Sequence, residues 1–138
     1  MVISGKELAD GIVARLREQV EGFPRKYGRG PALAVVLVGD DPASKTYVRS
    51  KERACERAGI THLTVALPAD SSQQEVLERI ARLNADESID GILVQLPLPK
   101  HLDEAIVTGA VAREKDVDGF HPGNAAALWQ GRDNAAVQ

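Results

Sequence analysis

The sequence predicts an α/β fold, a three-layer α/β/α domain built around a mainly parallel sheet. Residues 33–38 form an unbroken aliphatic run and residues 91–96 a nearly unbroken one, a pattern typical of strands buried on both faces. Segments with helical periodicity lie between the expected strands, and this βαβαβ order favours parallel pairing. Aromatic residues make up 4% of the 138 positions, so aliphatic side chains are expected to form the core.

The first expected element is an amphipathic helix over about residues 5–23. Ser4 and Glu7 have the S-x-x-E spacing of a capping box. Apolar residues then recur every four positions along one helix face, namely Leu8, Ile12, Leu16 and Val20. Pro24 and the Gly- and Pro-containing residues 28–31 predict a break before the first strand.

The second expected helix covers residues 42–58. Asp41 suits its N-cap, Pro42 suits the first helical position, and Gly59 supplies a stop. The chain order is therefore strand, turn, helix.

The remaining segments continue the alternation. A second strand is expected over residues 62–67, followed by a third helix that is capped by Ser71 or Ser72 and carries Val76, Ile80 and Leu83. The third strand then covers residues 91–96, and a short helix is expected over about residues 103–110. Residues 115–122 lack periodicity and predict a polar loop.

Composition excludes several classes of protein. Hydrophobic residues at 43% and charged residues at 27% exclude a disordered chain. The net charge is −3 and the 17 basic residues are spread along the chain, so we expect no nucleic-acid or membrane partner but a small molecule or a protein. Because no apolar run has the length of a signal peptide or a membrane span, a soluble, cytoplasmic protein is expected.

Cysteine and histidine usage argues against a metal site. Cys55 is the single cysteine, which excludes an intramolecular disulfide and favours a reducing compartment. Its place on the second helix predicts a half-buried core thiol. His62, His101 and His121 lack the spacing of zinc ligands, so no metal is expected.

Polar residues follow the expected strands at the edge of the sheet where open α/β folds bind ligands. Ser44, Tyr47 and Lys51 are spaced i, i+3 and i+7, which puts them on one helix face, with Tyr47 and Lys51 as direct neighbours. They can line a cleft. The alternative is a solvated face on which Lys51 pairs with a carboxylate.

Two further segments fall at the same edge. Gln95 interrupts an apolar strand, and a buried amide without partners costs about 1–3 kcal/mol, so protein or ligand must satisfy it. Asp116 and Asp118 precede Gly119 and are open to two interpretations, as ligand-binding carboxylates or as ordinary turn formers.

Three segments resemble, in order, the signature segments of the bifunctional methylenetetrahydrofolate dehydrogenase/methenyltetrahydrofolate cyclohydrolase family. They are GDDPASKTYVRSK at 39–51, DGILVQLPLP at 90–99 and KDVDGFHP at 115–122. The resemblance covers nearly the whole chain but only the first half of the family's sequence. It implies one folate-binding catalytic domain over residues 1–138, with the NADP-binding Rossmann domain of the family absent. Ala126 departs from the family, which more often has glycine there.

The resemblance also implies roles for individual residues. Lys51 would be the catalytic lysine, Tyr47 would stack on the folate, and Gln95 would hydrogen-bond near the lysine and tune it. Asp118 would hold the pterin ring, whose N–H and amine can donate two parallel hydrogen bonds to one carboxylate. The implied catalytic residues are Lys51, Tyr47 and Gln95. The implied substrate-binding residues are Ser44, Tyr47, Val48, Lys51, Gln95, Leu96, Pro97 and Asp118.

Family members use NADP to oxidise 5,10-methylene-tetrahydrofolate and then hydrolyse the methenyl product to 10-formyl-tetrahydrofolate. The methenyl group is cationic, so attack by water needs proton removal and no metal. No G-x-G-x-x-G or Walker pattern occurs in the chain, so no NADP is expected to bind it. The family forms homodimers largely through the NADP-binding half, which implies a monomer here.

Two other functions remain open. A folate-binding or interaction module without turnover would have the same cleft, and a hydrolysis assay separates it from an enzyme. The Y-x-x-x-K spacing of Tyr47 and Lys51 also occurs in short-chain dehydrogenases, but those enzymes have a glycine-rich dinucleotide loop upstream, where this chain has one strand.

Overall fold

The computed structural model describes residues 4–131 and contains a three-stranded parallel sheet. Strand β1 (Ala32–Val38) lies in the centre, flanked by β2 (Thr61–Leu67) and β3 (Gly91–Val94). In register, Ala32 pairs with Thr61, and Leu33 pairs with Gly91. The predicted parallel α/β architecture is confirmed.

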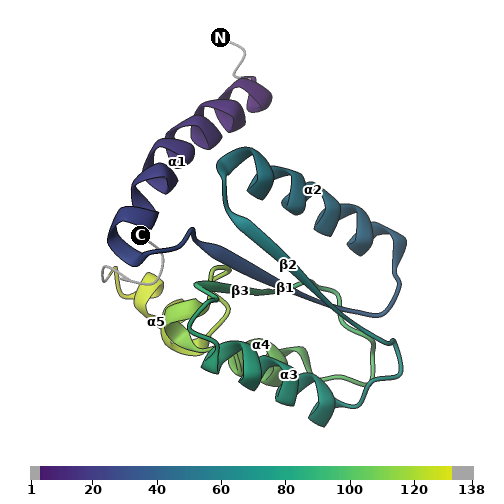
Figure 1. Cartoon of the computed structure of the whole chain (residues 1–138). Helices are drawn as coiled ribbons and strands as arrows, with labels where there is room; N and C mark the ends of the chain where they lie inside the picture. The colour runs from purple at the N-terminus through teal and green to yellow at the C-terminus, as the bar shows by residue number, and fades with distance from the viewer. Residues whose placement is uncertain (1–3, 132–138) are drawn as a thin grey trace.

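Helices cover both faces of the sheet (Figure 1). Helices α1 (Gly5–Tyr27) and α2 (Pro42–Ala58) lie on one side. On the other side lie α3 (Gln73–Ala85), α4 (Glu104–Gly109) and α5 (Pro122–Trp129). A short 3₁₀ helix, η1 (Arg113–Lys115), follows α4.

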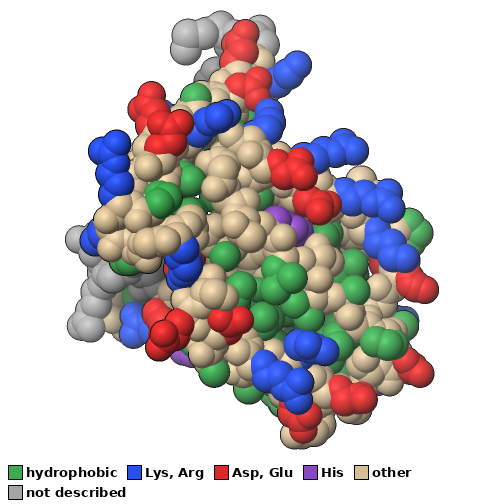
Figure 2. Space-filling view, in the orientation of Figure 1, with side chains coloured by type: hydrophobic (Ala, Val, Ile, Leu, Met, Phe, Trp, Pro, Cys, Tyr) green, Lys and Arg blue, Asp and Glu red, His purple; other side chains and the backbone are tan. Residues whose placement is uncertain are grey.

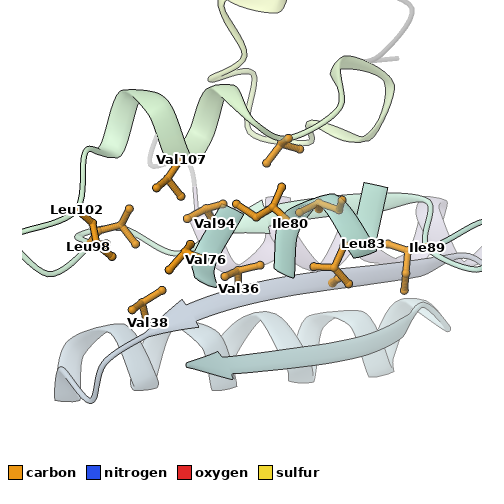
Figure 3. Packing of buried hydrophobic residues seen from close by; sticks show 13 residues of the cluster. Val36, Val38, Val76, Ile80, Leu83, Ile89, Val94, Leu98, Leu102 and Val107 are labelled. Carbon is orange, nitrogen blue, oxygen red and sulfur yellow. The ribbon is translucent and has the colours of Figure 1, made fainter. Parts of the chain in front are cut away.

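The two sides of the sheet carry hydrophobic clusters of unequal size. The larger cluster joins alternate β1 and β3 residues to α3 and α4, with Val36, Ile80 and Val107 completely buried (Figure 3). The smaller cluster, on the α2 side, consists of Val35, Leu37, Val48 and Leu93. Because strand side chains alternate between faces, neighbouring β1 residues belong to different clusters.

The predicted helix starts are confirmed. Asp41 caps α2 by accepting a hydrogen bond from the Ser44 N–H at 2.7 Å, and Gly59 ends the helix at φ 79°, in the left-handed region that favours glycine. Of the two serines considered for α3, Ser72 is the cap, and it forms a reciprocal capping box with Glu75.

Helix α1 ends later than predicted. It continues through Pro24 to Tyr27 and stops at Gly28, whose N–H donates to the Pro24 carbonyl. A proline inside a helix removes the hydrogen bond of its own N–H, but here the Phe23 and Tyr27 rings pack one turn apart, with centroids separated by 4.4 Å. This i,i+4 contact supports the extra turn.

Two differences concern the C-terminal half. Strand β3 ends at Val94, two residues before the predicted end, because the chain turns after Gln95 into a loop with a cis Leu96–Pro97 bond. Helix α5 was not predicted, because its eight residues are too few for a periodic signal. The polar loop is otherwise confirmed, with one isolated bridge between Asp116 and Ile92.

The apolar face of α1 is largely uncovered in the described structure. Leu8 is 56% exposed, Ile12 43% and Leu16 39%. Over residues 4–131, no helix is long and apolar enough to cross a membrane.

Candidate functional site

A lysine and an amide meet where α2 passes the end of β3. The Lys51 Nζ donates a hydrogen bond of 2.8 Å to the Gln95 Oε1. Helix α2 presents Lys51 toward the sheet, and Gln95 shares the α2-facing side of its strand with Leu93, two residues earlier. The alternative in which Lys51 pairs with a carboxylate is not seen, since within residues 4–131 the lysine forms no ion pair and bonds to an amide instead.

The Gln95 amide is held in one orientation. Its Nε2 donates to the Leu96 carbonyl at 2.8 Å, which leaves Oε1 to accept from Lys51. Gln95 is 8% exposed, so both bonds satisfy polar atoms that water reaches poorly. The residue is therefore satisfied by backbone and by a neighbouring side chain, and it fixes the position of the Lys51 amine.

Asp118 supplies a carboxylate near this pair. Its side chain is exposed, yet the surrounding protein atoms remove enough water to raise its pKa above the usual aspartate range; the Lys51 charge opposes this shift and the Asp116 carboxylate adds to it. The positive charge of the Lys51 amine therefore acts on the Asp118 carboxyl group.

Asp116 has a different role from Asp118. It is 3% exposed and accepts three hydrogen bonds, from the Gly119 N–H at 3.0 Å, the His121 N–H at 2.9 Å and the Asn124 Nδ2 at 2.9 Å. The turn-former interpretation is confirmed for Asp116. Since its oxygens are occupied and buried, Asp118 is the carboxylate available to a ligand.

The α2 residues Ser44 and Tyr47 differ in exposure. Ser44 is 2% exposed, and its hydroxyl has no hydrogen-bond partner in the described part of the chain. A buried polar group in this state costs about 1–3 kcal/mol, so a ligand that reached it would relieve a cost. The Tyr47 ring is 60% exposed and free to stack on a flat ligand.

Three other predicted site residues have three different surroundings. Val48 is buried in the smaller hydrophobic cluster and Leu96 packs against the larger one. Pro97 is exposed in the loop after β3. Contact of these residues with substrate stays a prediction.

Sequence reasoning missed Asn124 and Arg113. Asn124 is completely buried and bonds to Arg113 and to Asp116. Both residues lie outside the aliphatic runs that signal a core, and an asparagine two residues after a proline looks like part of a turn. Asn124 bonds to Asp116, 8 positions earlier, and to Arg113, 11 positions earlier. Because the chain between them is irregular, no sequence periodicity predicts these contacts.

Two of the three histidines, His101 and His121, form hydrogen bonds with the backbone. His101 bonds through Nε2 to the Ser71 carbonyl at 2.9 Å, and His121 Nδ1 accepts from the Gly123 N–H at 3.0 Å. Cys55 is a core thiol, as predicted, but it is buried rather than half-buried, and burial raises its pKa. Among residues 4–131, no cluster of three or more His, Cys, Asp or Glu side chains could hold a metal.

Comparison with known proteins gives one consistent family. Residues 3–118 match the tetrahydrofolate dehydrogenase/cyclohydrolase catalytic domain. The bifunctional protein FolD of Anaplasma phagocytophilum is 47% identical over 136 residues, which cover 99% of this chain and 45% of that protein. FolD of Treponema pallidum is 56% identical over 128 residues, 93% of this chain and 41% of that protein.

Solved structures agree. A 5,10-methylenetetrahydrofolate dehydrogenase from the silkworm Bombyx mori superposes with a TM-score of 0.92 at 41% identity, over 95% of this chain and 45% of that one. The Trypanosoma brucei methylenetetrahydrofolate dehydrogenase-cyclohydrolase, solved with NADP cofactor and inhibitor, gives 0.91 at 36% identity, over 98% and 46% of the two chains. The chain thus spans somewhat less than half the length of these relatives.

Proposed function

The chain belongs to the tetrahydrofolate dehydrogenase/cyclohydrolase family, and from this premise we propose that it provides the folate site and the reactive lysine for interconverting one-carbon units on tetrahydrofolate. The step assigned to its own residues is hydrolysis of 5,10-methenyl-tetrahydrofolate to 10-formyl-tetrahydrofolate. The observation that carries the proposal is the 2.8 Å bond between Lys51 and Gln95 beside an available carboxylate.

The reaction requires a general base and residues that hold the pterin ring in place. Water adds to the cationic methenyl carbon and loses one proton; the C–N5 bond then breaks, the hydroxyl proton is lost and N5 gains a proton. The reaction releases one proton overall. In its unprotonated form, the Lys51 amine takes the proton of the attacking water, and Gln95 orients that amine. Asp118 accepts hydrogen bonds from the pterin, and Tyr47 stacks on it.

The family oxidation step uses NADP, which accepts a hydride when bound. The described residues do not fit this cofactor. A pyrophosphate binds at a helix N-terminus reached by a glycine-rich turn, but the N-terminus of α2 is capped by the Asp41 carboxylate, whose pKa is lowered by the hydrogen bond that it accepts from the Ser44 backbone N–H. The negative charge of Asp41 opposes phosphate there, so no step through NADP is assigned to these residues.

The test measures hydrolysis of methenyl-tetrahydrofolate by the purified chain, and the readout is the loss of methenyl absorbance. We expect turnover above the buffer rate, and we expect Lys51→Met to lower it by about 10²–10⁴-fold, the usual effect of a positioned acid or base. Lys45→Met, on the exposed side of α2, is the matched control. Equal rates for wild type and Lys51→Met would refute the catalytic assignment and favour a binding module without turnover.

We also propose that the chain is monomeric and cytoplasmic. The single cysteine suits a reducing compartment. Light scattering after size exclusion gives the molecular mass in solution, and a mass near twice that of the chain would contradict the monomer.

A further inference from the structure

A cluster of hydrogen-bonded polar side chains, two of them buried and the third, Arg113, exposed, adjoins the Asp118 loop. The Asn124 cluster consists of Arg113, Asp116 and Asn124. Asn124 comes from α5 and is completely buried, while Asp116 is 3% exposed. Groups so deeply buried rarely stay polar without a structural reason.

The cluster fixes the backbone on the C-terminal side of Asp118. The two Asp116 oxygens accept from the Gly119 and His121 N–H groups, so the chain from 116 to 121 wraps around the Asp116 carboxylate. Gly119 takes φ 73°, a left-handed conformation that favours glycine. The loop therefore leaves the Asp118 side chain on its outer surface, in the electrostatic range of Lys51.

Asn124 in turn holds Asp116 in place. Its Nδ2 donates to the Asp116 Oδ2 at 2.9 Å and to the Arg113 carbonyl at 3.0 Å, and its Oδ1 accepts from the Arg113 Nε at 2.9 Å. Both amide protons and the amide oxygen are thus used. No other residue type of this size offers two donors and one acceptor in that arrangement.

We propose that Asp116 and Asn124 are positioning residues of the folate site, which act by holding Asp118 where it meets the pterin. This inference rests on the proposed function, because it takes Asp118 as the pterin-binding carboxylate. It assigns α5, which contributes no predicted ligand contact, to the substrate site.

Asn84 provides a matched control. It is an asparagine that is partly buried, and it connects the start of the same segment to α3: its Nδ2 donates to the Ala110 carbonyl at 2.8 Å and its Oδ1 accepts from the Ala112 N–H at 2.9 Å. These bonds lie before Asp116. Replacing Asn84 by alanine removes two hydrogen bonds from the segment without touching the Asp118 loop.

The experiment compares Asn124→Ala, Asn84→Ala, Asp118→Ala and the double variant Asn124→Ala/Asp118→Ala in the full chain. The readouts are the melting temperature, the Kd for 5-formyl-tetrahydrofolate and the NMR titration of the Asp118 carboxyl. We expect both asparagine variants to lower the melting temperature. Of these two, only Asn124→Ala should raise the Kd, by about 10-fold, the effect of misplacing one charged hydrogen-bond partner. In the Asp118→Ala background the same change should alter the Kd less than about twofold, because residues that act through one another are not additive.

The titration tests the position of Asp118 without any ligand. In Asn124→Ala the loosened loop lets water reach Asp118, so its pKa falls toward the usual aspartate range, whereas in Asn84→Ala it does not move. Asp116→Asn, which keeps the side-chain volume, should act in the same direction and replaces Asn124→Ala should that variant not fold.

The results that would refute the inference differ from the results that would refute the proposed function. The positioning role is refuted if Asn124→Ala changes the Kd equally with and without Asp118, or if it leaves the pKa of Asp118 unchanged. Either result leaves the assignment of folate binding intact. Equal Kd values for wild type and Asp118→Ala overturn the pterin assignment, and the titration alone then decides whether the Asn124 cluster positions the carboxylate.

Discussion

Lys51, Gln95 and Asp118 provide an amine, an amide and a carboxylate, and local contacts prepare each of them differently. The Gln95 Nε2 is committed to the Leu96 carbonyl, so the amide oxygen faces Lys51. Asp118 is left free because Asp116 takes the backbone N–H groups of the loop. The division of work between the two aspartates follows from their burial, which is 3% exposure for Asp116 against an exposed Asp118.

At this scale we predict that Asp118→Ala weakens binding of 5-formyl-tetrahydrofolate by about 1.5–3 kcal/mol, the usual contribution of hydrogen bonds to a charged group. Isothermal titration calorimetry measures the change. Asp70→Ala, which removes another exposed carboxylate, should leave the Kd unchanged. An unaltered Kd in Asp118→Ala would place the pterin elsewhere.

The site was only partly predictable from individual residues. The helical spacing of Tyr47 and Lys51 and the polar Gln95 in a strand marked the region, but spacing alone allowed a solvated Lys51. The family resemblance was needed to join Lys51 to Gln95, because 44 positions separate them in the chain. The Asn124 cluster left no signal, since its contacts connect irregular segments.

Among the elements, the segments that precede β1 and β3 are joined by a charged pair. Arg29 donates to both Asp90 oxygens, at 2.7 and 3.0 Å, and Asp90 also accepts from the Ala32 N–H at 2.8 Å. The hydrogen bonds from Arg29 lower the pKa of Asp90 more than burial raises it. This bidentate contact holds the start of β3 beside the start of β1.

The pair predicts a pH-dependent stability. Because the folded pKa of Asp90 is depressed, its contribution is present above the ordinary aspartate pKa and is lost as the pH falls through the depressed value. Asp90→Asn should therefore lower the free energy of unfolding at pH 7 by at most about 1 kcal/mol, since the pair is partly exposed, and by less at pH 3. Urea unfolding at both pH values measures this. The control is Asp10→Asn, at the more exposed pair with Arg57, which should change the free energy of unfolding less between the two pH values. A larger loss of unfolding free energy for Asp90→Asn at pH 3 than at pH 7 would contradict the assignment.

Helices α1 and α3 carry apolar faces in very different surroundings. Ile80 of α3 is completely buried, whereas Ile12 of α1 is 43% exposed. Figure 2 shows α1 extending from the body of the molecule, with charged side chains along it.

These two isoleucines make a matched prediction. Ile80→Ala should lower the free energy of unfolding by about 2–5 kcal/mol through loss of core contacts, and Ile12→Ala should change it by about 0.5 kcal/mol or less. Urea denaturation of both variants gives the comparison. A cost above about 2 kcal/mol for Ile12→Ala would show that another surface covers the α1 face in solution.

Local signals predicted most elements, and the misses have physical causes. Capping residues and glycine stops located both ends of α2 and the start of α3. The end of α1 was missed because the Phe23–Tyr27 contact outweighs the break expected at Pro24. Helix α5 was missed because its eight residues give no periodic signal, and because the contacts of its buried Asn124 with Arg113 and Asp116 are tertiary features.

For the whole molecule, the parallel sheet has candidate site residues such as Gln95 at its carboxyl edge, where open α/β sheets bind ligands. The aliphatic composition and the strand order were sufficient to predict this arrangement. The unequal size of the two hydrophobic clusters was not predictable, because both strand faces have the same aliphatic character in the sequence.

We predict at this scale that the chain does not bind NADP in the micromolar range. The described residues offer no glycine-rich turn at a helix N-terminus, and Asp41 puts a negative charge at the start of α2. Calorimetric titration with NADP should give only heats of dilution, and Asp41→Asn should not restore binding. A micromolar Kd for the wild-type chain would contradict this prediction.

The unequal clusters have a consequence for dynamics. Lys51 lies on α2, which contributes Val48 to the smaller cluster, while Gln95 directly follows β3, whose Ile92 and Val94 belong to the larger cluster. Layers with fewer buried apolar contacts open at lower free energy, so the α2 amides should exchange hydrogen with solvent sooner than those of β1. A ligand that contacts both Lys51 and Gln95 spans the boundary between the two layers, and its binding energy would close the less stable layer onto the more stable one.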